Sequence, residues 1–414
     1  MPPGMKLTKI EKAWVLYDVG NSAFILLVST LFPIYFNAIA QQAGISDIDY
    51  LAYWGYAVSA VTIIVAVSGP VLGAMTDFKG FKKPVFTASM LLGSAGCCLL
   101  GFTRHWLLFL VIFVIAKCGF SASLIFYDAM LSDVTSPERM DEVSSKGFAW
   151  GYIGSCVPFV IGLILVLNAE RFGIGQLAAM TAAFVLSALW WLAASLPLCI
   201  SYRQKHYIQP QRRAVADSFR RLAGTLRHLR KDKEVFWFLL AFFCYIDGVY
   251  TIIEMATAYG TALGLDTTGL LLALLLTQIV AFPATLLFGK LSGRYPARVL
   301  ISVCIVAYTL ITLFGMTLDS QPKFWILAVC VGLFQGGVQA LSRSYFAKII
   351  PPEKSGEYFG IFDICGKGAS FLGTLLVSVT SQVTGSMNYG IGSLIVLFVL
   401  GLFLFQKSCN HARE

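Results

Sequence analysis

The feature that most constrains this chain is a series of apolar stretches, each about as long as a bilayer is thick. A helix crosses the hydrocarbon core with about 20 residues, and twelve stretches of this length can be marked along the 414 residues. They lie at 12–36, 50–75, 84–103, 105–132, 146–168, 175–200, 235–260, 268–290, 298–318, 323–350, 357–382 and 388–406. We therefore predict an all-α membrane protein with twelve transmembrane helices.

The composition agrees with this prediction. Only 13% of the residues are charged and the mean hydropathy is +0.75, whereas about a quarter of the residues of a soluble domain are charged. The formal net charge is +9, but the Lys and Arg residues fall between the apolar stretches. We therefore expect membrane lipids around the chain and no nucleic-acid partner.

The cysteines and histidines indicate no metal site and no cofactor. Nine of the ten cysteines, from Cys97 to Cys365, lie in or at the edges of apolar stretches without a CxxC pair, which is typical of small packing residues. All four histidines lie outside the stretches. No nucleophile with His and acid, and no HExxH motif, falls in a span, so we do not expect an enzyme.

The distribution of the 31 Lys and Arg residues predicts the orientation. The first stretch, at about 24 residues, exceeds the ~7–15 residues of a signal peptide's apolar region, so we interpret it as an uncleaved span. With cytosolic termini, 26 of the basic residues are cytosolic; Arg104, Arg171 and Lys323 lie outside, and Lys117 and Lys367 lie within spans. Because cytosolic loops carry an excess of Lys and Arg, we predict cytosolic N- and C-termini, in a prokaryotic plasma membrane.

The longest connection, 201–234, divides the chain into two halves of six spans each, 1–200 and 235–414. It carries ten Lys or Arg residues against three acids. Its apolar residues at helical spacing are Val215, Phe219, Leu222, Leu226 and Leu229. This pattern fits a basic amphipathic helix on anionic lipid, and a solvated linker is the alternative.

An internal repeat relates the two halves. The stretch "GAMTDFKGFKK" (73–83) is echoed by "GKLSGRYPARV" (289–299), an offset of 216, and "SPERMDE" (136–142) by "PPEKSGE" (351–357), an offset of 215. Two motifs in register indicate duplication. We therefore expect two pseudo-symmetric six-helix bundles.

The first motif resembles the loop between helices two and three of the major facilitator superfamily. Gly73, Asp77, Gly80, Lys82 and Lys83 match its pattern, Phe78 replaces the usual Arg, and Lys79 is adjacent; in the second half Gly289, Arg294 and Arg298 match, with Gly293 and Pro296 in place of the Asp and the Gly. The resemblance implies a gate on the cytosolic side made by Asp77 and basic neighbours, for which the candidates are Lys79, Lys82, Lys83 and Arg294.

A narrower resemblance covers most of the chain. "WVLYDVGNSAF", "YIDGVYTI" and "GLFQGGVQALSRSYFAKIIPPE" are similar to the vacuole-effluxer-like branch of that superfamily, also called the unknown major facilitator family. Fungal members of the branch export amino acids from the vacuole. The resemblance implies the major facilitator fold, in which helices one, four, seven and ten line a central cavity.

Charged residues within the spans follow that division, because spans one, four, seven, ten and eleven carry nearly all of them. An ionisable residue in lipid normally faces a bundle interior or a wet pathway. Asp18 and Asn21, with the adjacent Tyr17, share a face of span one. They form either a substrate or proton site or a polar pair that satisfies itself near Gly20.

Span seven holds Asp247 and Glu254, seven residues apart and therefore on nearly the same face, ~10 Å apart along the axis. Two stacked carboxylates suit a proton relay, unless Glu254 is simply hydrated. Lys117 in span four can bind a substrate carboxylate or form an ion pair with Asp18 or Asp247. Asp128 lies near the cytosolic end of span four, where we predict a gate role.

Spans ten and eleven complete the candidates. Gln335 and Gln339 suit a polar or zwitterionic solute because amides both donate and accept. Arg343, one further turn toward the cytosol, is a gate candidate. Asp363 and Lys367, at i and i+4, are predicted to form an internal salt bridge near the gate.

We therefore predict a secondary transporter, acting as a monomer, that moves a small amino acid-like or zwitterionic solute by alternating access. Protons or another coupling ion would drive it through Asp18, Asp247 or Glu254, and export is a possible direction. Two alternatives remain: an exporter of amphiphilic drugs or lipids, and a membrane receptor that transports nothing. No nucleotide-binding loop is present to supply ATP-driven transport.

Overall fold

The computed structural model describes residues 6–209, 224, 225, 227, 229, 231–367 and 369–411, apart from a few side chains within the helices. The predicted amphipathic segment of the linker falls mostly outside these residues. The described part of the chain is almost wholly helical, and its only β-bridge joins Phe78 to Ile208.

The helices divide into two sets along the chain. The first half comprises α1 (Lys9–Ser29), α2 (Leu31–Gln42), α3 (Asp47–Thr76), α4 (Lys82–Leu100), α5 (Trp106–Ala129), α6 (Leu131–Val134), α7 (Met140–Leu167) and α8 (Gln176–Ser201). The second half comprises α10 (Lys233–Ala262), α11 (Thr267–Leu291), α12 (Ala297–Gly315), α13 (Gln321–Ile349), α14 (Ser355–Lys367), α15 (Ala369–Thr384) and α16 (Met387–His411). Short 3₁₀ turns, Pro137–Arg139 and Pro352–Lys354, precede α7 and α14.

The predicted spans correspond to these helices with two breaks. Ten described helices are long and apolar enough to cross a membrane, and α1 with α2 makes an eleventh span bent by 40°. The bend has a local cause. Pro33 has no backbone N–H to donate, and its ring clashes with the backbone carbonyl of the residue four positions earlier. The remaining predicted span, 357–382, is divided between α14 and α15, and its apolar helical part is short.

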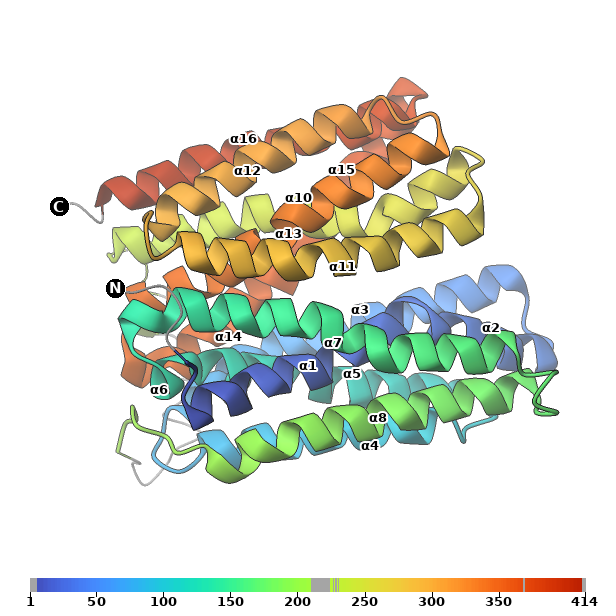
Figure 1. Cartoon of the computed structure of the whole chain (residues 1–414), viewed down its shortest axis with the longest axis horizontal. Coiled ribbons are helices and arrows are strands. Elements are labelled where there is room, and N and C mark those ends of the chain that lie inside the picture. Colours follow the sequence, from blue (N-terminus) through green and yellow to red (C-terminus); the bar gives the residue numbers. More distant parts are fainter. Residues whose placement is uncertain are drawn as a thin grey trace.

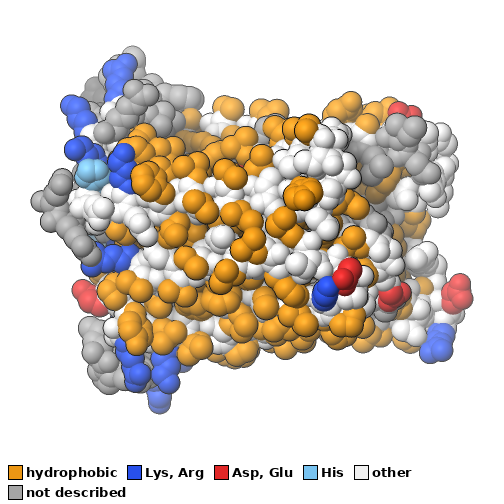
Figure 2. Space-filling view, turned by 90° about the horizontal axis from the view of Figure 1, so that it is seen from above, with side chains coloured by type: hydrophobic (Ala, Val, Ile, Leu, Met, Phe, Trp, Pro, Cys, Tyr) orange, Lys and Arg blue, Asp and Glu red, His pale blue; other side chains and the backbone are white. Residues whose placement is uncertain are grey.

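Both termini lie at the same end of the helix bundle, which we call the terminal end; the opposite end is the distal end (Figure 1). The two halves lie one above the other in this view, and α14 crosses to lie beside helices of the first half at the terminal end. Apolar side chains cover the middle of the face shown in Figure 2, and Lys and Arg side chains gather at the terminal end. This arrangement is that of a multi-pass integral membrane protein.

The duplication inferred from the sequence is visible in side-chain contacts. The Tyr17 hydroxyl lies 2.6 Å from the Ser123 hydroxyl, and in the second half the Tyr245 hydroxyl lies 2.6 Å from that of Ser342. All four groups are buried, so each hydroxyl pair satisfies polar atoms that would otherwise lack a partner. Each pair joins the first span of its half to the fourth. The two bundles therefore share this contact between corresponding helices.

The halves approach most closely between α3 and α14. A Cβ added to Gly73 would lie 2.1 Å from the Gly356 carbonyl oxygen, and one added to Gly360 would lie 2.6 Å from the Cα of Pro70. The small residues of both helices therefore permit backbone contact across the two halves. This contact places the start of α14 against the end of α3.

Candidate functional site

Arg343 of α13 joins the two halves near the terminal end. Its Nη1 lies 3.0 Å from Oδ1 of Asp128 on α5 and 3.4 Å from Oδ2 of Asp18 on α1. Its Nε donates to the Ser144 hydroxyl and its Nη2 to the Ser144 carbonyl, each at 3.0 Å. The Arg343 side chain is only 3% exposed, so a second-half cation is fully enclosed by acceptors of the first half.

Aromatic rings complete the enclosure of this guanidinium. Its central carbon lies 4.2 Å from the Phe148 ring centroid and 4.6 Å from that of Trp14. A planar guanidinium stacks on such faces and makes hydrogen bonds at its edge, which a lysine ammonium cannot do. Local sequence explains the position of Asp18, because Gly147 of α7 leaves room for its carboxylate.

Asp77, at the end of α3, binds the first turn of α14. Its Oδ1 accepts from the Gly356 amide at 2.8 Å and its Oδ2 from the Glu357 amide at 3.0 Å. The first amides of a helix have no intrahelical acceptor and carry partial positive charge, so a carboxylate stabilises this end. The first-half carboxylate thereby caps a second-half helix.

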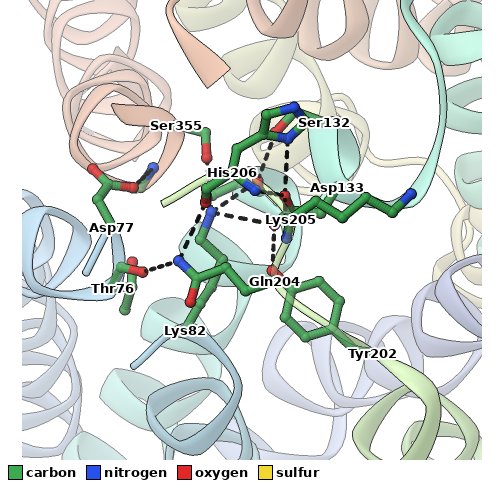
Figure 3. A network of polar contacts seen from close by, with 12 residues as sticks. Thr76, Asp77, Lys82, Ser132, Asp133, Tyr202, Gln204, Lys205, His206 and Ser355 are labelled. Atoms are coloured by element: carbon green, nitrogen blue, oxygen red, sulfur yellow. Dashed lines mark hydrogen bonds and ion pairs between the residues drawn. The ribbon is translucent and has the colours of Figure 1, made fainter. Parts of the chain in front are cut away.

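Lys82 makes a second connection in the same region (Figure 3). Its ammonium lies 2.8 Å from the Ser355 hydroxyl of the second half and 3.6 Å from Asp133 of α6. Asp133 also accepts from the His206 backbone amide at 2.8 Å and from the Tyr202 hydroxyl. Burial and the Asp133 carboxylate hold the pKa of Tyr202 well above its ordinary value, so the hydroxyl remains a donor. The chain after α8 is thus bound to the gate.

A third connection lies between α7 and α13. The Asp141 carboxylate accepts from the Ser344 hydroxyl and forms an ion pair with Lys348, each at 2.6 Å. Like the contacts of Arg343, Asp77 and Lys82, these contacts join described residues of the two halves. They lie in the half of the bundle nearer the termini, so the two halves are joined at the terminal end.

Lys117 and Glu254 belong to opposite halves and carry opposite charges. Lys117 lies midway along α5, half-buried, with its Nζ 5.0 Å from the Phe120 ring centroid. Glu254 lies on α10, closer to the distal end, and its side chain is exposed. The charges of the two residues interact. An ammonium of the first half and a carboxylate of the second half are thus near enough for their charges to interact.

Asp247 is placed differently from Glu254. It is fully buried, and its Oδ1 accepts from the Gly373 amide of α15 at 2.9 Å and from the Thr251 hydroxyl at 3.3 Å. Asp247 therefore lies inside the second half rather than facing Lys117. The predicted ion pair between Lys117 and either Asp18 or Asp247 does not form, because Asp18 lies with Arg343 and Asp247 with α15.

The amides of α13 divide between two environments. Gln335 is buried and borders a small apolar pocket of ≈ 40 Å³ between α10, α11 and α13. This pocket is also lined by Ile253 and Ala256, the neighbours of Glu254 on α10. Gln339 is half-buried one turn nearer the gate.

The remaining predicted residues lie as follows. Asn21 donates to Asp18 at 3.4 Å; Asp363 is half-buried and interacts electrostatically with Asp128. Lys79 lies over the Tyr207 ring and Lys83 donates to the Ile200 carbonyl, so both bind the chain after α8 rather than the second half. Arg294 is exposed, and the side chain of Lys367 lies outside the described residues.

Sequence reasoning missed several residues of the contacts at the terminal end, chiefly Asp133, Asp141, Ser144 and Ser355. Asp141 and Ser355 fall within the repeated "SPERMDE" and "PPEKSGE" motifs, so the repeat itself was a usable signal. Asp133 follows Asp128 by five residues at the end of a span, and nothing in its sequence context distinguishes it. Its function depends on the folding back of residues 202–208, which no local pattern predicts.

Comparison with known proteins defines the class. The chain matches the family described as "Vacuole effluxer Atg22 like" over residues 8–138 and 132–413. It belongs to this family and is a major facilitator superfamily transporter, not an enzyme. The resemblance stated from the sequence motifs is confirmed.

Two relatives illustrate the range of similarity. An uncharacterized MFS-type transporter, YxiO, of Bacillus subtilis (strain 168) is 42% identical over 404 residues, covering 96% of this chain and 94% of that protein. Autophagy-related protein 22 of Eremothecium gossypii is 24% identical over 460 residues, covering 95% of this chain and 89% of that protein.

Solved structures confirm the predicted fold. A bacterial homologue of the iron transporter ferroportin in an outward-facing state has a TM-score of 0.72 at 17% identity, with 97% of this chain and 98% of that chain covered. The human organic anion transporter MFSD10 has a TM-score of 0.71 at 15% identity, with 96% and 98% covered. At these identities the similarity establishes the major facilitator fold alone.

Proposed function

We propose that this protein is a secondary transporter that carries a small zwitterionic, amino acid-like solute by alternating access, coupled to protons. We infer that it works as a monomer, because each half supplies part of one site. The basic side chains at the terminal end support cytosolic termini, since Lys and Arg are retained on the cytosolic side. The bacterial relative supports a prokaryotic plasma membrane.

The observation that carries this proposal is the pair of Lys117 and Glu254 on opposite halves. A zwitterion presents a carboxylate and an ammonium, and these groups complement the two side chains. Binding would join the halves through the solute, which is what alternating access around a central site requires. The contacts of Arg343, Asp77 and Lys82 join the halves between this site and the terminal end, which supports access to the site from the distal end.

The apolar pocket between α10, α11 and α13 supports a preference among amino acids. Its lining is mostly aliphatic and aromatic, with Gln335 at one edge. An apolar side chain of the solute placed against this lining would lose water-exposed area. We therefore infer a neutral amino acid with an apolar side chain.

Binding measurements with Lys117→Gln and Glu254→Gln test this function. Removing one charged hydrogen-bonding partner costs about 1.5–3 kcal/mol, so each variant should lose ~10- to 100-fold in affinity for neutral apolar amino acids. Asp319→Asn, on an exposed residue paired with Lys323 at the surface, is the matched control and should bind normally. Unchanged binding in both site variants would contradict the proposed site.

The same pocket favours a second candidate, an exporter of amphiphilic molecules, because its lining is mostly apolar. The two functions separate in one screen. An amphiphile that binds equally well to wild type and to Lys117→Gln would support this alternative. A requirement for both the amino and the carboxylate group would exclude it.

A further inference from the structure

We propose that Asp247 carries the coupling proton at a site separate from the solute site, and that α15 and α14 transmit its charge state to the gate. This inference rests on the proposed transport function and names the site at which coupling occurs. It assigns different tasks to Asp247 and Glu254 of α10.

The first observation is that the Asp247 carboxyl group has one oxygen without a partner. Oδ1 is occupied by Gly373 and Thr251, whereas Oδ2 is buried and has no hydrogen-bond partner within the described part of the chain. No described Lys or Arg side chain forms an ion pair with it. A buried carboxylate without a cation is strongly disfavoured and takes up a proton instead. Asp247 is therefore a neutral acid in this state.

The second observation is that the side chains described at this position suit a proton better than a hard divalent cation. Asp247 and Thr251 supply the side-chain oxygens at this position, and no cluster of three or more His, Cys, Asp or Glu residues exists among the described residues. A hard cation such as Ca²⁺ needs about six to eight oxygens. A proton needs one carboxylate oxygen, which Oδ2 provides.

The charged and titratable neighbours of Asp247 are few. Glu254 and Cys244, both on α10, interact with it electrostatically. The sequence of α15 contains no ionisable residue between 369 and 384. On α14, Cys365 interacts with Cys244 and Asp363 rather than with Asp247. Glu254 is thus the one acid that can exchange a proton with this site from α10.

Glu254 provides the route for that exchange. It lies seven residues beyond Asp247, ~10 Å along the helix axis toward the distal end, and its side chain is exposed. A proton from the distal side would bind Glu254 and pass through water to Oδ2 of Asp247. It would leave Asp247 as a carboxylate when the terminal end opens and water reaches the site.

The route from Asp247 to the gate runs along one predicted span. Asp247 binds a backbone amide of α15, and Asp77 of the first half binds the first amides of α14. A carboxylate accepts a stronger hydrogen bond than a neutral acid does, so loss of the proton tightens the hold on α15. Gly373 makes this contact possible, since a Cβ there would lie 2.2 Å from the Thr251 hydroxyl.

Infrared difference spectroscopy of the purified full chain tests the proton site without any solute. The wild type should show the carbonyl-stretch band of a buried protonated carboxyl group at neutral pH. Asp247→Asn should lose this band and remain folded, because the amide oxygen still accepts from Gly373; a thermal melt checks this. Asp319→Asn should keep the band. The absence of the band in wild type, or its persistence in Asp247→Asn, would overturn the proposal.

Transport in proteoliposomes tests coupling, with L-methionine as the probe. Asp247→Asn should still exchange the probe across the membrane when there is no pH gradient. It should lose, at least tenfold, the accumulation that a pH gradient drives in wild type. Gradient-driven accumulation in Asp247→Asn would reject the proton role. No exchange by the wild-type protein would instead contradict the proposed solute, while the infrared result would still stand.

Discussion

Asp18 and Asp247 occupy corresponding regions of the two halves and have opposite environments. Each lies within two residues of a tyrosine that pairs with a serine of the fourth span of its half. Asp18 lies against Arg343, with its charge matched by a cation from the other half. Asp247 lies against a backbone amide, with one oxygen unpartnered among the described residues.

This difference shows how duplicated bundles acquire different tasks. A paired carboxylate stays ionised and holds two parts together, so Asp18 serves the closed gate. A carboxyl group without a cation in the same setting is more stable as the neutral acid. The shared fold positions both residues, and the presence or absence of one guanidinium determines which task each performs.

The largest effect should follow from Arg343→Ala, which leaves the Asp18 and Asp128 carboxylates buried without their cation. Removing one member of a buried pair costs about 3–5 kcal/mol, so we expect a large fall in the thermal unfolding midpoint in detergent. Arg294→Ala removes an exposed arginine at the same end of the bundle and serves as the control. Equal melting of the two variants would show that Arg343 does not hold the halves together.

The two aspartates should respond differently to the same substitution. Asp18→Asn removes a charged partner of Arg343 and should destabilise by about 1.5–3 kcal/mol. Asp247→Asn replaces a neutral acid by an amide of similar shape and should change stability by roughly 1 kcal/mol or less. Paired thermal melts measure both. A larger loss of stability in Asp247→Asn than in Asp18→Asn would contradict the proposed difference between the two aspartates.

Asp77→Ala should have a smaller effect, because it removes the cap of α14 while leaving Arg343 in place. Losing a helix cap costs about 0.5–2 kcal/mol. The corresponding position of the second half is Gly293, which is exposed and cannot cap, so Gly293→Ala is the matched control. A thiol reagent should reach a cysteine introduced at Ser355 faster in Asp77→Ala than in Gly293→Ala.

The smallest and most equal effects should come from Tyr17→Phe and Tyr245→Phe. Each removes one buried hydrogen bond to a serine, worth about 1 kcal/mol, and the two contacts have the same length. Melting curves for the two variants should therefore nearly coincide. A clear difference would mean that the two bundles are not equivalent at this level.

Sequence reasoning predicted the helices and the two-bundle fold, because the length and spacing of apolar stretches are set by the bilayer. It also selected Arg343 and Asp77 as gate residues, and both make contacts between the halves. It paired Lys117 with the wrong acids, since helix periodicity orders residues along one face but does not state which helices meet. The break between α14 and α15, and the return of residues 202–208 to Asp133, depend on tertiary contacts that no local pattern contains.

Distances between spin labels at both ends of the bundle test the central claim most directly. Labels at Glu138 and Glu353, exposed equivalents at the terminal end, and at Glu170 and Asp319, exposed at the distal end, would report both gates. We predict that Asp77→Ala lengthens the distance between the labels at the terminal end and, in the same molecules, shortens the distance between the labels at the distal end. Lengthening of the first distance with no change in the second would contradict alternating access around one site.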